Sequence, residues 1–124
     1  MKRILVVDDE VPIRELFGDL LRDEGYSVVF AGSGRETLRM LETQPPDMVL
    51  LDLMMMDGNG WDVLEAMRAH AHWRDIPVAI LTNHGDLVRK GEFSLPFLTK
   101  PFDLERLVEV VLDAIGPATD PEQT

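Results

Sequence analysis

The chain has 124 residues, the length of one ordinary domain, and 45% of them are hydrophobic, which indicates a folded globular protein. Its formal net charge of −11 argues against a nucleic-acid partner or an anionic membrane surface, because their phosphates would repel it. The lack of cysteine excludes disulfides and thiolate chemistry. No stretch has the pattern of a signal peptide or a membrane span, so we expect a cytoplasmic protein.

Short apolar runs alternate with segments of helical periodicity. In chain order, the runs that predict buried strands are residues 4–7, 28–30, 48–51, 78–81 and 95–98. The predicted helices run from Pro12 to Gly25, from the N-cap Ser33 to Pro45, over about 61–71, and from the N-cap Asp103 to Gly116. Residues 83–94 must hold two loops and a helix and include two glycines, so that helix can have at most about two turns.

This alternation predicts an α/β domain whose parallel sheet is covered by helices on both faces. We expect the domain to occupy residues 1–116 and the polar residues 117–124 to form a disordered tail. In an open parallel sheet, ligands bind beyond the carboxyl ends of the strands. The residues that follow each predicted strand therefore define the candidate site.

Those residues have complementary chemistry. Asp8 and Asp9 follow the first predicted strand, Asp52 the third, Thr82 the fourth, and Lys100 comes shortly after the fifth. Crowded carboxylates repel one another, so either one of them holds a proton or a cation lies among them, and oxygen ligands favour Mg²⁺. A metal beside a carboxylate, a hydroxyl and an ammonium group can hold a phosphoryl group for in-line attack by the carboxylate. The product would be an aspartyl phosphate.

Four segments carry a resemblance to a known family: ILVVDDE, VLLDLMM, IPVAILT and LPFLTKPF. Together and in this order they resemble the receiver domain of two-component response regulators, over residues 3 to about 115. The resemblance implies a doubly wound, flavodoxin-like, five-stranded parallel sheet with the strand order 2-1-3-4-5. The stretch from Thr82 to Lys100 is about one helical turn shorter than is usual in the family, which implies a shortened fourth helix.

The resemblance also implies which residue accepts the phosphoryl group and which residues bind the metal. Asp52 corresponds to the phospho-acceptor, and Asp8 and Asp9 to the metal-binding pair, with Asp9 as the direct ligand. Mg²⁺ would also be bound by Asp52 and by the backbone carbonyl of Met54.

Three further residues correspond to the machinery that reads the phosphoryl group. Lys100 is implied to contact the acceptor carboxylate and then the phosphoryl group, and its bond to Pro101 is usually cis in the family. Thr82 corresponds to the switch hydroxyl, and Phe97 to the switch aromatic residue.

The function implied is that of a stand-alone receiver in a phosphorelay. It would take a phosphoryl group from a histidine kinase or a histidine phosphotransfer protein and signal to an unknown protein partner by conformational change, as a monomer or weak dimer. It would catalyse its own phosphorylation and dephosphorylation without a separate substrate.

Three alternatives come from other classes. One is a receiver-like interaction module that acts without phosphorylation. A haloacid-dehalogenase-type phosphatase would need an Asp-x-Asp nucleophile, whereas Asp8 and Asp9 are adjacent. A flavodoxin-like cofactor binder would need a Ser/Thr-rich loop after the first strand, where this chain is acidic.

Overall fold

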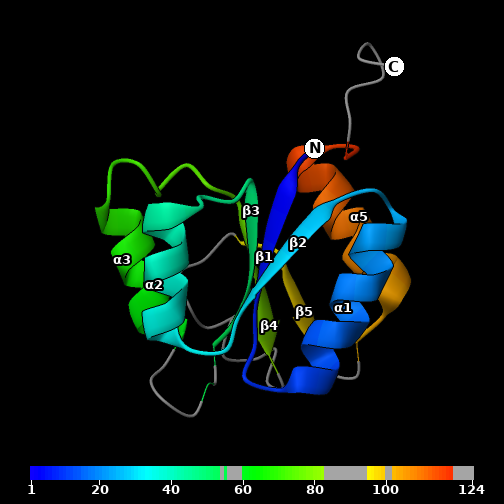
Figure 1. The fold of residues 1–124 in the computed structure, drawn as a ribbon, viewed down its shortest axis with the longest axis horizontal. Helices are drawn as coiled ribbons and strands as arrows, with labels where there is room; N and C mark the ends of the chain where they lie inside the picture. The colour runs from blue at the N-terminus through cyan, green and yellow to red at the C-terminus, as the bar shows by residue number, and fades with distance from the viewer. Residues whose placement is uncertain (54, 56–59, 83–94, 100–101, 119–124) are drawn as a thin grey trace.

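A computed structural model describes residues 1–53, 55, 60–82, 95–99 and 102–118. Within these residues, five strands and four helices follow one another along the chain (Figure 1). The strands are β1 (Arg3–Val7), β2 (Ser27–Ala31), β3 (Met48–Asp52), β4 (Val78–Thr82) and β5 (Phe97–Thr99). The helices are α1 (Val11–Asp23), α2 (Gly34–Thr43), α3 (Gly60–Ala69) and α5 (Leu104–Ile115).

The strands form one parallel sheet in the order β2-β1-β3-β4-β5, which confirms the predicted fold class. Helices α1 and α5 cover one face of the sheet, and α2 and α3 cover the other (Figure 1). In β1, Ile4 and Val6 pack in the core beneath α1 and α5, whereas Leu5 and Val7 pack beneath α2 and α3. Because both faces of the sheet are buried, the strands are continuous apolar runs.

Local sequence signals set most helix ends. The side chain of Ser33 accepts a hydrogen bond from the Glu36 N–H (3.1 Å) at the start of α2. Asp103 likewise accepts one from the Glu105 N–H (3.0 Å) at the start of α5. These bonds satisfy backbone donors that have no partner within the helix, as predicted for both N-caps. Gly25 has a φ of +96°, a conformation suited to the turn that follows α1.

Most predicted elements differ from the structure by one or two residues at an end, and β5 and α3 are two such cases. Strand β5 begins at Phe97 and not at 95, since Pro96 has no N–H for the ladder, although its carbonyl accepts from the Ile80 N–H (2.9 Å). Helix α3 ends at Ala69 and not at 71. The chain continues from there as turns, in one of which the Trp73 N–H donates to the carbonyl of His70 (3.0 Å).

The carboxyl-terminal segment stays attached to the domain beyond the predicted boundary at residue 116. Ala118 is buried, and its carbonyl accepts a hydrogen bond from the Lys2 N–H (3.2 Å). In the structure this backbone bond joins the start of the predicted tail to the chain just before β1. Residues 119–124 and the predicted fourth helix in 83–94 lie outside the described residues. None of the described helices combines the length and apolarity that a membrane crossing requires.

Candidate functional site

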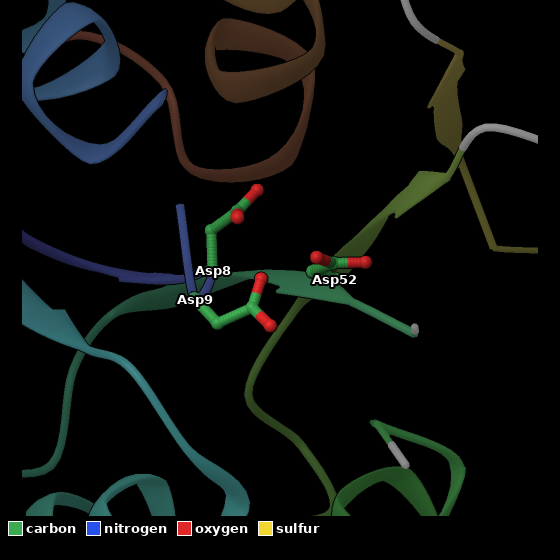
Figure 2. A group of neighbouring side chains, drawn as sticks. All are labelled: Asp8, Asp9 and Asp52. Carbon is green, nitrogen blue, oxygen red and sulfur yellow. The ribbon is translucent and has the colours of Figure 1, made fainter. Parts of the chain in front are cut away.

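Three carboxylates meet where the carboxyl ends of β1 and β3 lie side by side. These strands are neighbours, and their register pairs Val7 with Leu51, which brings the next residues, Asp8 and Asp52, to the same level. One oxygen each from Asp8, Asp9 and Asp52 lies within 4.8 Å of the other two (Figure 2). Asp8 and Asp52 are buried, and Asp9 is half-buried. The structure therefore brings together the three acids that the sequence placed at this edge.

Backbone hydrogen bonds hold Asp8 in place. Its N–H donates to the carbonyl of Ala31 (3.1 Å), which continues the β1–β2 ladder by one residue. Its Oδ1 accepts from the Glu10 N–H (2.8 Å), directly before α1. A fully buried carboxylate needs such donors, because burial removes the water that would otherwise solvate its charge. The turn between β1 and α1 thus orients this carboxylate, and Glu10 contributes to the site through its backbone.

Asp52 is the last residue of β3 and lies opposite Leu81 of β4 in the strand register. The next peptide continues this pairing, since the Leu53 N–H donates to the carbonyl of Leu81 (3.3 Å). On its other side, the carbonyl of Leu53 accepts from the N–H of Gly60, the first residue of α3 (3.0 Å). The backbone around Asp52 is therefore bonded to both β4 and α3.

The other predicted site residues that the structure describes belong to β4 and β5. Thr82 ends β4, is buried, and pairs in register with Thr99 of β5. Phe97 is half-buried and packs against the core beneath α2 and α3. Lys100 follows Thr99 in the chain, but Lys100 itself, Pro101 and Met54 lie outside the described residues. The implied roles of these side chains stay predictions.

The donor set of the cluster suits Mg²⁺. The ion prefers oxygen ligands in octahedral geometry at about 2.1 Å, so two oxygens bound to it lie about 3–4 Å apart. Three carboxylate oxygens that lie within 4.8 Å of one another come close to this spacing. Without a cation, three ionised carboxylates at this separation would repel one another strongly in a partly buried site, unless one of them held a proton. A divalent cation would remove that repulsion.

Two contributions to this site escaped the sequence interpretation. One is the Glu10 N–H that holds Asp8, and the other is the close contact of Gly60 with the backbone at Asp52. The bond from Glu10 to Asp8 is donated by a backbone N–H, which almost every residue type has, so the residue type at position 10 gives no signal for it. For Gly60, the one available signal was a glycine close to the predicted start of a helix.

Comparison with known proteins assigns the family. The family model for the response regulator receiver domain matches residues 4–112. The transcriptional regulatory protein GlrR of Escherichia coli is 39% identical over 94% of this chain and 28% of its own length. The phosphate regulon regulator PhoB of Escherichia coli is 37% identical over 94% of this chain and 54% of its own length. The chain thus spans between about a quarter and a half of these relatives.

Solved structures agree with this assignment. Chemotaxis response regulator CheY4 of Vibrio cholerae superposes with a TM-score of 0.84 at 28% identity, covering 93% of this chain and 99% of that one. The receiver domain of NtrX from Brucella abortus gives a TM-score of 0.79 at 31% identity, covering 90% and 97%. The parallel sheet with its acidic edge, the family match and these neighbours lead to one conclusion: the chain belongs to the response regulator receiver domain family of two-component signalling.

Proposed function

We propose that this chain is a phosphorylatable receiver whose acceptor is Asp52. The observation that carries the proposal is the cluster of Asp8, Asp9 and Asp52, whose oxygens lie within 4.8 Å of one another at the carboxyl ends of adjacent strands. The phosphoryl donor would be a histidine kinase or a histidine phosphotransfer protein. The output would pass to a protein partner through a conformational change, and the protein would act in the cytoplasm.

In the proposed reaction, a carboxylate oxygen of Asp52 attacks the phosphorus atom. A new O–P bond forms as the P–N bond of the donor phosphohistidine breaks, and the electron pair leaves with the imidazole nitrogen. Hydrolysis of the resulting acyl phosphate by water would release inorganic phosphate and restore the carboxylate. Such chemistry modifies the receiver itself and needs no separate substrate.

Mg²⁺ is the proposed cofactor, and when bound it supplies positive charge that offsets the phosphoryl oxygens. Asp8, Asp9, Asp52 and the backbone carbonyl of Met54 would hold it, with Asp9 as the direct ligand of the amino-terminal pair. The bond from the Glu10 N–H would keep the buried Asp8 carboxyl group in place beside this position.

Lys100, Thr82 and Phe97 are proposed to respond to the phosphoryl group. The ammonium group of Lys100 would contact the acceptor carboxylate and then a phosphoryl oxygen. The hydroxyl of Thr82, at the end of β4, would move to the phosphoryl group, and the ring of Phe97 would change its packing in response. The register pairing of Thr82 with Thr99, directly before Lys100, supports a common site for the two groups.

Intact-mass measurement after incubation with acetyl phosphate and Mg²⁺ tests the acceptor. The wild type should gain the mass of one phosphoryl group, and Asp52→Asn should gain none. Asp19→Asn is the matched control, because Asp19 is an exposed aspartate on α1, and it should be labelled like the wild type. Unchanged labelling of Asp52→Asn would refute the assignment, and an unlabelled wild type would favour an interaction module that acts without phosphorylation.

Amide spectra recorded with beryllofluoride, a phosphoryl mimic, test the switch. Thr82→Ala should still be phosphorylated but should lose most of the shifts that the wild type shows away from the site. Thr43→Ala, at the end of α2, is the control and should respond as the wild type does. A full wild-type response in Thr82→Ala would show that the hydroxyl has no part in the switch.

A further inference from the structure

The first residue of α3 lies directly against the backbone of Asp52. Gly60 is buried, and a Cβ atom built on it would lie 2.3 Å from the Asp52 carbonyl oxygen and 2.8 Å from the Cα of Leu53. Real Cβ atoms essentially never approach another heavy atom within 3.0 Å. Both neighbours are backbone atoms, so no side chain can rotate away to make room.

The need for glycine at this position is spatial. Among the described glycines only Gly25 and Gly116 have positive φ angles, so alanine could adopt the backbone conformation of Gly60. Alanine also has the higher helix propensity and would favour α3. The space occupied by the Asp52–Leu53 backbone is therefore what excludes a side chain here.

The Asp52–Leu53 backbone is held from the opposite side as well. Asp52 lies opposite Leu81 in the β3–β4 register, and the Leu53 N–H donates to the Leu81 carbonyl (3.3 Å). The Leu53 carbonyl in turn accepts from the Gly60 N–H (3.0 Å). A side chain on residue 60 would have to displace Asp52, separate β3 from β4, or lift α3 off the sheet.

We propose that Gly60 is a positioning residue for the aspartyl acceptor. Its lack of a side chain lets the start of α3 close onto the Asp52–Leu53 backbone and keeps the Asp52 carboxylate at its short separation from Asp8 and Asp9. This inference rests on the proposed function, because it concerns the placement of a nucleophile. A misplacement of about 1 Å can slow an enzymatic reaction about a hundredfold, so even a partial shift of Asp52 should be measurable.

The test compares Gly60→Ala with Gly34→Ala. Gly34 is also the first residue of a helix, α2, but a Cβ built there meets only the Val63 Cγ2, at an ordinary 3.4 Å. Initial rates of phosphorylation by acetyl phosphate are measured by intact mass at saturating Mg²⁺, so that weaker metal binding cannot account for a loss. Gly60→Ala should be slower by about tenfold or more, and Gly34→Ala should stay within about twofold of the wild type.

Amide spectra without any donor separate this proposal from the proposed function. In Gly60→Ala the amides of Asp52, Leu53 and Leu81 should shift, whereas in Gly34→Ala they should not. Shifts confined to α3, or a folded Gly60→Ala that is phosphorylated at the wild-type rate, would overturn the proposal. If the wild type itself is not phosphorylated, the proposed function fails, and these spectra alone decide whether Gly60 positions Asp52.

A second variant covers the case in which Gly60→Ala does not fold. Val63→Ala shortens a buried side chain three residues after Gly60 in α3. It weakens the packing of the helix and adds no atom at residue 60. If contact with α3 positions the acceptor, the Asp52 amide should shift and phosphorylation should slow severalfold. An unchanged Asp52 amide together with an unchanged rate would overturn the proposal.

Discussion

Removal of one charge from the acidic cluster should stabilise the protein in the absence of metal. One oxygen each from Asp8, Asp9 and Asp52 lies within 4.8 Å of the other two. Two unit charges about 4.8 Å apart in a medium of effective dielectric constant about 20 repel by about 3.5 kcal/mol. Asp9 is half-buried, so water screens part of this repulsion. We therefore expect Asp9→Asn to raise the free energy of unfolding by about 1–2 kcal/mol in EDTA.

Mg²⁺ should reduce or reverse the difference in the free energy of unfolding between Asp9→Asn and the wild type. An ion that binds only the folded state adds about 1.4 kcal/mol to its stability when the free ion is at about ten times its dissociation constant. The wild type should gain this amount, and Asp9→Asn should gain much less because it has lost a ligand. Urea unfolding followed by circular dichroism, in EDTA and in Mg²⁺, measures both free energies.

Asp19→Asn controls for the general effect of net charge. It removes one negative charge from an exposed position on α1 and should change stability little in either buffer. An Asp9→Asn variant that is no more stable than Asp19→Asn in EDTA would contradict charge repulsion within the cluster. Equal stabilisation of Asp9→Asn and the wild type by Mg²⁺ would contradict the role of Asp9 as a ligand.

Contacts around α5 support three further predictions. The hydroxyl of Tyr26 donates a hydrogen bond to the Gly116 carbonyl (2.5 Å), and burial raises the pKa of this hydroxyl. The protonated hydroxyl therefore contributes its full stabilisation below pH about 10, and this contribution is lost as the pH rises through the raised pKa. Tyr26→Phe should cost about 1 kcal/mol at neutral pH and weaken the alkaline loss of stability in urea titrations; an unchanged alkaline loss would contradict this. Asp103→Ala should lower the free energy of unfolding by about 1 kcal/mol through loss of the N-cap, and equal urea midpoints would contradict it. Phe102→Ala removes a ring packed edge-on against Phe17 at 5.0 Å and should cost about 2 kcal/mol; an unchanged melting temperature would contradict that packing.

Local chemistry explains why so much of the fold could be predicted. Ser33 and Asp103 are N-caps whose side chains bond to backbone groups two or three residues away, so a short window of sequence contains the whole signal. The strands are recognisable for a similar reason, since burial on both faces selects continuous apolar runs. The ends of the strands are harder to predict than their presence. Strand β5, for example, begins later than predicted because Pro96 cannot donate to the ladder.

For the candidate site, the sequence predicts which residues come together but does not by itself predict what each of them does. A parallel sheet places the carboxyl ends of its strands along one edge, so Asp8, Asp52 and Thr82 were expected to approach one another once the strands were recognised. Their assigned roles rest on resemblance to a family, since the same residues in another order along the chain would serve other chemistry.

Elements with short-range signals can be predicted from the sequence alone: the apolar strands, the helix caps and the acids at strand ends. Three features became visible only in the folded structure: the separations within the acidic cluster, the bond from the Glu10 N–H to Asp8, and the contact of Gly60 with the Asp52 backbone. The burial of Ala118 and its bond to Lys2 are a fourth such feature. Each contact depends on how elements distant in the chain pack together, and the residue types alone carry no information about distances between such elements.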